Sequence, residues 1–238
     1  MDGPSGSGKS STARGVADRL GLRYLDTGAQ FRAMTVWMLR HGVDVHDVEA
    51  VAAHAAEPRI VSGTDPLEPT ITLDGEDVAE EIRSADTTAA VSPVATVPAV
   101  RARLLELQRA TIAAALAEGG IVVEGRDIGS VVWPDAEVKL YLTADPGARA
   151  ARRAAENGST SVRSTEEDLL RRDAIDSGRT TAPLVVPDGA THLDTTPWTL
   201  EEVVDRVVAI VESTRGAGAG TAGARTAGAD AGGHRASP

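Results

Sequence analysis

The sequence predicts an α/β fold built on a parallel sheet, and two observations indicate it. Two short, nearly all-apolar runs, Ile121–Val123 and Val138–Leu142, are typical of parallel strands that helices cover on both faces. Segments with apolar residues at helical spacing alternate with such runs along most of the chain. The length of 238 residues fits one domain with insertions.

Spacing and turn residues predict the elements of the N-terminal half. They are a helix over 9–20, a strand over 22–25, a helix from about 27 to Gly42, a weaker helix over 46–56 and a small β insertion over 59–81. Gly21 marks the end of the first helix, and Asp74-Gly75 marks a turn inside the insertion.

The same signals predict the elements of the C-terminal half. They are a long helix over about 98–118, strands over 121–123 and 138–142, two arginine-rich helices between 145 and 178, a strand over 191–194 and a final helix. Thr199 and Glu202 form a capping box for that final helix. From Thr214 the chain is mostly Gly and Ala, so we expect residues 214–238 to be a disordered tail.

The N-terminus is short for this fold. Only Met1 and Asp2 precede Gly3, where a central buried strand is expected, and two residues cannot make a strand. We therefore expect that the first strand is missing, because the start is assigned too late or the chain is truncated. On that hypothesis the chain as written folds poorly and a version with about ten more upstream residues is stable.

Composition excludes several classes of function. The 24 Lys+Arg against 35 Asp+Glu give a net charge of −11, which argues against binding of a nucleic-acid polymer. Cysteine is absent and the five histidines show no ligand spacing, so we expect no thiolate or histidine metal site. No apolar run approaches the roughly 20 residues of a membrane span, and we expect no leader, because the first residues lack the charged-then-apolar pattern. We expect a cytoplasmic protein with no membrane partner.

The segment Gly3–Ser10 carries the complete pattern G-x-x-x-x-G-K-[ST]. In such a phosphate loop, backbone N–H groups and the following helix N-terminus surround a nucleotide phosphate. Lys9 is expected at the β- and γ-phosphates and Ser10 on Mg²⁺. The expected nucleotide contacts are Gly3, Pro4, Ser5, Gly6, Ser7, Gly8, Lys9, Ser10 and Ser11. The alternative is a chance Gly/Ser loop, and the pattern alone gives binding rather than a reaction.

Five segments in matching order resemble the bacterial cytidylate kinases, within the nucleoside monophosphate kinases. They are Asp2–Gly6 with Gly8-Lys9; Asp26–Arg32; Ser92–Ala95 with Arg101; Glu124–Gly129; and Arg172-Asp173 through Asp176, Arg179 and Ala182–Leu184. The resemblance covers about residues 1–212. The phosphate loop is common to many families, whereas the segments at 26–32 and 125–129 are specific.

The resemblance implies a doubly wound P-loop kinase core with a parallel five-stranded sheet. Residues 1–213 would form one kinase domain, with its core at 1–30, 86–145 and 180–213, a monophosphate-binding region at 31–85 and a lid at 146–179. It implies transfer of the γ-phosphoryl group of ATP to CMP or dCMP, with Mg²⁺, in a monomer. We expect the lid and the acceptor-binding region to move when both substrates bind.

The resemblance also assigns the site by position. The catalytic cations that it implies are Lys9, Arg126, Arg172 and Arg179. The CMP-binding set that it implies is Thr27, Phe31, Arg32, Ser92, Arg101, Arg126, Asp127, Arg172, Asp176 and Arg179. Within that set, Arg32, Arg126 and Arg179 clamp the acceptor phosphate, for which the planar arginine fork is suited. Ser92, Arg101 and Asp127 read cytosine, since a carboxylate accepts from its amino group.

Several residues also fit a purely structural role. Arg149, Arg152, Arg153 and Arg163 fit ordinary solvated helix arginines as well, and Arg172 and Arg179 fit pairs with Asp173 and Asp176. Asp26 fits a helix N-cap. Glu124 fits either a holder of water on Mg²⁺ or a simple strand-end charge. Phe31 and Ile175 depart from the family pattern, where tyrosine and a further arginine occur, so a hydroxyl contact and one lid cation are lost.

Two other functions stay open from the sequence. One is another small P-loop kinase, acting on UMP, AMP, shikimate or dephospho-coenzyme A. The other is a non-catalytic ATP-binding module. The trio Ser92, Arg101 and Asp127 separates the first from a cytidylate kinase, and turnover separates the second. A GTPase is disfavoured because no N-K-x-D segment is present.

Overall fold

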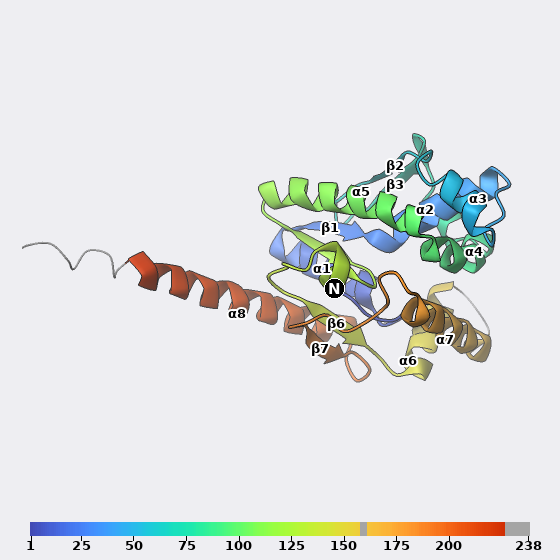
Figure 1. Ribbon diagram of the computed structural model, residues 1–238. Helices are drawn as coiled ribbons and strands as arrows, with labels where there is room; N and C mark the ends of the chain where they lie inside the picture. The colour runs from blue at the N-terminus through green and yellow to red at the C-terminus, as the bar shows by residue number, and fades with distance from the viewer. Residues whose placement is uncertain (158–160, 227–238) are drawn as a thin grey trace, which may run out of the picture.

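The structure is a computed structural model that describes residues 1–157 and 161–226. Its helices are α1 (Lys9–Leu20), α2 (Thr27–Arg40), α3 (Val48–Ala53), α4 (Ala85–Thr96), α5 (Pro98–Ala117), α6 (Pro146–Asn157), α7 (Val162–Gly178) and α8 (Leu200–Thr226) (Figure 1). Its strands are β1 (Arg23–Asp26), β2 (Ile60–Ser62), β3 (Ile71–Leu73), β4 (Glu76–Asp77), β5 (Ile121–Glu124), β6 (Leu140–Thr143) and β7 (Thr191–Asp194). The predicted α/β class with parallel strands is confirmed.

Two parallel strand pairs meet at the first two residues of the chain. β1 pairs with β5, and β6 pairs with β7, both in parallel. Between them, the Met1 amino group donates to Val123 O at 2.8 Å, and Gly125 N–H donates to Met1 O at 3.0 Å. Asp2 N–H donates to Leu140 O, and the Asp2 carbonyl oxygen accepts from Leu142 N–H, both at 2.8 Å. The backbone of Met1-Asp2 thus joins β5 to β6 by a bridge, without being a strand.

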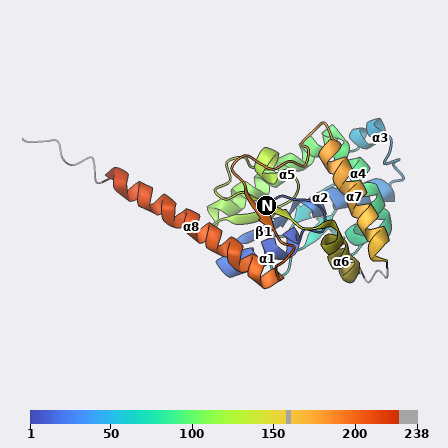
Figure 2. The same cartoon turned by 90° about the horizontal axis from the view of Figure 1, so that it is seen from below.

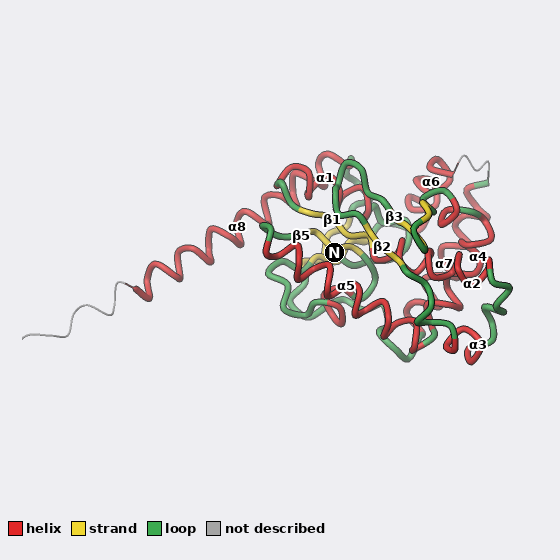
Figure 3. Tube along the Cα trace, turned by 90° about the horizontal axis from the view of Figure 1, so that it is seen from above, coloured by secondary structure: helices red, strands yellow, loops and turns green. Residues whose placement is uncertain are grey.

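Helices cover both faces of these strands. Figures 2 and 3 show α1 and α5 on opposite sides of β1. Tyr24 packs with α1, β6 and α8 in one apolar cluster, while its neighbour Leu25 packs with Ile112 of α5 in another. Consecutive strand residues point to opposite faces, which explains the nearly all-apolar runs.

A second apolar core supports the region between α2 and α5. Strands β2, β3 and β4 form the predicted β insertion, as an antiparallel sheet. Met34, Met38 and Leu73 are buried in this core together with Leu104 of α5. Helix α5 therefore ties the insertion to the parallel strands, since its Ile112 belongs to the other core.

Helix α4 was absent from the sequence-based expectations. Its sequence is rich in β-branched residues and contains Pro93, so its intrinsic helix propensity is low. The Ser84 hydroxyl caps it by accepting from Thr87 N–H at 3.2 Å, and Val91 and Val94 are buried. Packing against α2 and α5 stabilises the helix where propensity does not.

Helix α8 begins at the predicted capping box and extends beyond the predicted end of the domain. Thr199 N–H donates to Glu202 at 2.9 Å, and Glu202 N–H donates to the Thr199 hydroxyl at 3.3 Å. The helix continues to Thr226 and runs away from the rest of the molecule (Figures 1 and 2). The helix extends beyond residue 214, where a disordered tail is expected from the sequence, and that expectation stays a prediction. Residues 227–238 lie outside the described residues.

Helices α6 and α7, the predicted arginine-rich pair, lie side by side. Among the helices of the described residues, none combines the length and the apolar character that crossing a membrane requires. The expectation that the chain as written folds poorly stays a prediction.

Candidate active site

A cleft of about 720 Å³ lies between the phosphate loop, the start of α2, the β insertion, α4 and the arginine-rich helices. Two walls of the cleft are positioned by strand ends, because β1 and β5 both deliver their carboxyl ends to it. Ligands bind at that edge in open parallel sheets. The cleft is therefore the candidate active site.

The phosphate loop has the backbone that its glycines allow. Gly3, Gly6 and Gly8 all have positive φ, of 145°, 75° and 85°. A Cβ on Gly3 would stand 2.0 Å from Leu142 O, so only glycine fits where the loop leaves the sheet. Gly8 ends the loop, and α1 begins at Lys9 with its free N–H groups toward the cleft.

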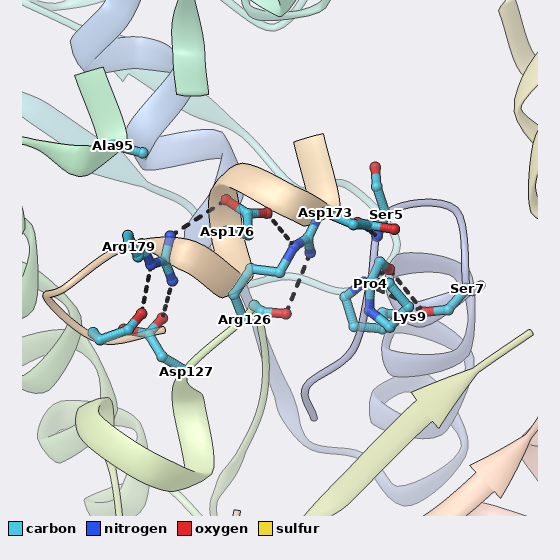
Figure 4. A network of polar contacts seen from close by, with 12 residues as sticks. Pro4, Ser5, Ser7, Lys9, Ala95, Arg126, Asp127, Asp173, Asp176 and Arg179 are labelled. Carbon is cyan, nitrogen blue, oxygen red and sulfur yellow. Dashed lines mark hydrogen bonds and ion pairs between the residues drawn. The ribbon is translucent and has the colours of Figure 1, made fainter. Parts of the chain in front are cut away.

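Lys9 is held inside this loop. Its Nζ donates to Pro4 O at 2.7 Å and lies 3.4 Å from the Ser7 hydroxyl (Figure 4). The residue is 5% exposed. Burial, and then the neighbouring Arg126 cation, lower the pKa of Lys9 to about 7. Lys9 is thus a partly desolvated cation that gains by receiving an anion.

Two carboxylates stand side by side at the strand ends. Asp26 and Glu124 are register partners of β1 and β5, and both line the cleft. Asp26 accepts from Ala29 N–H at 3.0 Å, which confirms its N-cap interpretation. Tyr24 donates its hydroxyl to Glu124 at 3.2 Å. Burial, and then repulsion by Glu124, raise the pKa of Asp26 to about 6.

An arginine–aspartate cluster forms the opposite wall (Figure 4). Arg101 pairs with Asp127, and both side chains are buried. Arg179 lies 3.9 Å from Asp127 and 3.4 Å from Asp176. Arg126 Nε donates to Asp176 at 3.0 Å. The alternating charges explain how so many ionised groups share a buried wall.

Burial and neighbouring charges oppose each other in this cluster. Burial disfavours the charged form of Arg126, but Asp176, Asp173 and Glu124 hold its pKa above the ordinary arginine value. Burial raises the pKa of Asp127, against the opposing effect of Arg101 and Arg179. The wall therefore carries fixed cations whose hydration has been removed, which strengthens their attraction for an anion.

Two further arginines line the cleft, and for each the largest effect of a neighbouring charge comes from another arginine. Burial, and then the charge of Arg172, lower the pKa of Arg32 to about 9. Burial, and then Arg126, lower the pKa of Arg172 to about 10. Arg32 is anchored by donating to Ile82 O at 2.9 Å and to the Thr88 hydroxyl at 3.0 Å. This mutual repulsion of cations favours a bound phosphate between them.

Most of the predicted site residues meet in this one cleft. Those that line it are Ser5, Gly6, Ser7, Gly8, Lys9, Ser10, Ser11, Thr27, Phe31, Arg32, Ser92, Arg101, Glu124, Arg126, Asp127, Arg172, Asp176 and Arg179. Gly3 and Pro4 are not among the residues that line it, and Pro4 contributes the carbonyl oxygen that accepts from Lys9. Arg101 also lies over the Phe31 ring, 5.3 Å from its centre, so these two predicted residues support each other.

Sequence reasoning missed the lining from two segments. The β insertion contributes Ser62, Gly63 and Thr70, whose sequence has no distinctive pattern. Thr195 and Trp198 contribute from the segment after β7. Thr195 and Trp198 could have been predicted from their position directly after a strand, because the carboxyl ends of parallel strands meet at one edge of a sheet.

The solvated interpretation of the arginines of α6 and α7 is wrong for Arg149 and correct for Arg163. Arg149 is 5% exposed and pairs with Asp173, whereas the Arg163 side chain is 91% exposed. Arg152 donates to Thr195 O at 2.7 Å and lines the cleft. Arg179 does pair with Asp176, as the second interpretation had it, while still facing the cleft.

Comparison with known proteins identifies the family of the chain. Residues 1–213 match the sequence profile of the cytidylate kinase family. The cytidylate kinase of Streptomyces avermitilis is 56% identical over 217 residues, which cover 91% of this chain and 93% of that protein. Those of Streptomyces coelicolor and Rhodococcus opacus are 57% and 47% identical, over 90% and 92% of this chain and 92% and 96% of theirs. With its phosphate loop opposite a buried arginine–aspartate wall, the chain belongs to the cytidylate kinase family.

Proposed function

We propose that this chain transfers the γ-phosphoryl group of ATP to CMP or dCMP, giving ADP and CDP or dCDP. The observation that carries the proposal is the cleft of about 720 Å³ in which Lys9 and the loop face Arg126, Asp127 and Arg179. One side has the chemistry for a donor triphosphate, and the other has that for a phosphate and a cytosine. Phosphoryl transfer needs positioning and charge neutralisation more than covalent help.

The residues have separate tasks in this proposal. Lys9 and the loop N–H groups bind the transferred phosphate, while Arg32, Arg126 and Arg179 hold the acceptor phosphate in line with it. Asp127 accepts from the cytosine amino group, and Ser92 and Arg101 donate to the ring acceptors. Arg172 and Asp176 contact the ribose. Thr27 and Phe31 complete the wall beside the base.

The residues present fit a magnesium ion. Ser10, Asp26 and Glu124 bring oxygen donors to the same side of the cleft, and oxygen ligands are those that Mg²⁺ prefers. Ser10 would hold the ion with the ATP phosphates, and Glu124 would hold one of its waters. When bound, the ion neutralises phosphate charge.

Finer features belong to the same proposal. We propose a doubly wound core with one five-stranded arrangement, in which Met1-Asp2 occupies the place between β5 and β6. Residues 31–85 bind the monophosphate, and 146–179 form a lid that closes over both substrates and excludes water. A monomeric enzyme fits, because this one chain supplies both sides of the cleft. We also propose a cytoplasmic location.

The direct test is ADP release from ATP and Mg²⁺ with CMP, dCMP, UMP, AMP, shikimate or no acceptor. We expect rapid release only with CMP and dCMP. Release with another acceptor would still identify a kinase, but it would contradict the assignment of Ser92, Arg101 and Asp127 to cytosine recognition. Absence of release with ATP still bound would identify a binding module.

Lys9 predicts proton uptake on ATP binding. With its pKa at about 7, Lys9 is mostly neutral at pH 8 in the free protein, and bound phosphate raises that pKa again. Affinity for ATP should therefore fall about tenfold per pH unit above pH 7. Calorimetry at pH 8 in buffers of different ionisation enthalpy should show uptake approaching one proton. Lys9→Arg keeps its charge and should lose this uptake; equal uptake in both proteins would contradict the prediction.

A further inference from the structure

The peptide of Ser5 in the phosphate loop is held at both of its polar atoms by the arginine-rich helices. Its N–H donates to Asp173 Oδ1 of α7 at 2.9 Å (Figure 4). Its carbonyl oxygen accepts from Arg149 Nη1 of α6 at 2.9 Å. Arg149 and Asp173 also pair with each other. Two helices and the loop therefore share one closed set of charged hydrogen bonds.

This set is shielded from solvent and closely packed. The side chains of Arg149 and Asp173 are 6% and 15% exposed. A Cβ on Gly6 would stand 3.2 Å from Arg149 Cβ and 3.4 Å from Leu169 of α7, so the helices lie directly on the loop. Charge-assisted hydrogen bonds removed from water are stronger than exposed ones. The contact is thus a strong link and not a chance surface pair.

One stripe of α7 connects this link to the opposite wall of the cleft. Leu169, Asp173 and Asp176 stand at helical spacing, so they lie along one face. Leu169 is buried beside Gly6, Asp173 holds Ser5, and Asp176 holds Arg126 and Arg179. Displacement of α7 along its axis would disturb the loop and the arginine–aspartate cluster together.

We propose that Arg149 and Asp173 are positioning residues that clamp the phosphate loop to α7 and thereby couple the binding of the two substrates. A nucleotide on the loop fixes Ser5, Ser5 fixes α7, and α7 places Arg172, Asp176 and Arg179 for the acceptor. The hydrogen bonds of Asp173 go to Ser5 and Arg149, and its charge also attracts the Arg126 cation of the acceptor wall. The inference rests on the proposed function, because it takes the loop as the ATP site and the cluster as the CMP site.

The experiment measures the coupling itself. The Kd for CMP is measured by calorimetry with and without the non-hydrolysable ATP analogue AMP-PNP and Mg²⁺, for the full chain. We expect CMP to bind about tenfold more tightly to the wild-type protein when the analogue is present. Asp173→Asn keeps the shape of the side chain but removes its charge, and Arg149→Met keeps length without charge. Either substitution should reduce the coupling factor, the ratio of the Kd for CMP without the analogue to that with it, to below about twofold.

Two comparisons separate a clamp from a general structural effect. Asp168→Asn breaks the Arg171–Asp168 pair, which lies on the same helix with both side chains 67% exposed, and should keep the wild-type factor. The Arg149→Met/Asp173→Asn double variant should lose no more coupling than either single one, since the residues act as a unit. Thermal melting identifies any variant that fails to fold, and the conservative Asp173→Asn then carries the test.

A wild-type coupling factor in Asp173→Asn and Arg149→Met would overturn the inference, and so would a factor near one in the wild-type protein. Failure of the proposed function is distinguishable, because it appears as absence of CMP-dependent ADP release by the wild-type protein. If the wild-type enzyme is active and the variants keep its coupling factor, the clamp is contradicted and the proposed function stands.

Discussion

Replacement of Lys9 by methionine should lower kcat for CMP phosphorylation by about 10²- to 10³-fold, the loss typical when one fixed donor to a developing charge is removed. Lys9 is held against Pro4 O at 2.7 Å with 5% exposure, so its position is fixed before substrate arrives. No other side chain of the phosphate loop carries a charge. Steady-state kinetics with coupled ADP detection gives the measurement.

Lys139 provides the matched control for that experiment. It is the other lysine of the chain, and its ammonium donates to Asp188 O at 3.2 Å on the surface. Lys139→Met should therefore leave kcat within about twofold of the wild-type value, since isolated surface charges contribute little. A Lys9→Met enzyme with more than a tenth of wild-type kcat would show that the loop backbone alone carries the phosphate contacts.

Replacement of Asp127 should change base selection more than ATP use. Asp127→Ala should raise the KM for CMP about 100-fold, because a charged hydrogen bond to the base is lost and Arg101 and Arg179 lose their shared anion. Asp127→Asn presents an amide that can donate to the uracil carbonyl. That variant should lower the ratio of kcat/KM for CMP over UMP at least about tenfold.

The KM for ATP provides the internal control for Asp127, since the residue is on the acceptor wall and not on the loop. Asp168→Ala, in an exposed pair of α7, should leave both KM values unchanged. An unchanged CMP rate in Asp127→Ala would remove this residue from base recognition. An equal rise in both KM values would instead indicate a general loss of the cleft.

The spacing of apolar residues predicted those helices and strands whose own sequence shows which face is buried. Helix α1 ends at Leu20, directly before the predicted Gly21, and β7 spans the predicted 191–194. Helix α4 escaped prediction because its stability comes from the surface of α2 and α5, which the local sequence does not contain. The extent of α8 could not be predicted, because the Gly/Ala sequence after Thr214 has no apolar face that would mark a packed helix.

The candidate site divides in a similar way. Residues within contiguous motifs, such as Lys9 and Asp127, could be named because phosphate and base chemistry demands those types. Arg149 and Asp173 could not be separated from ordinary helix charges, since their burial depends on where two helices lie on a distant loop. The closeness of Asp26 and Glu124 likewise requires the β1–β5 register.

The bridge made by Met1 and Asp2 has a consequence for the order in which the molecule folds. Its partners lie at Val123, Gly125, Leu140 and Leu142, so the two strand pairs are joined through contacts between Met1-Asp2 and residues more than half the chain away. Contacts of such long sequence separation form slowly, because the loop entropy must be overcome first. On the ribosome, the first residues emerge long before their partners. The strand pairs on either side are thus joined only when residue 142 is free, and until then Met1 and Asp2 remain unpaired and open to other contacts.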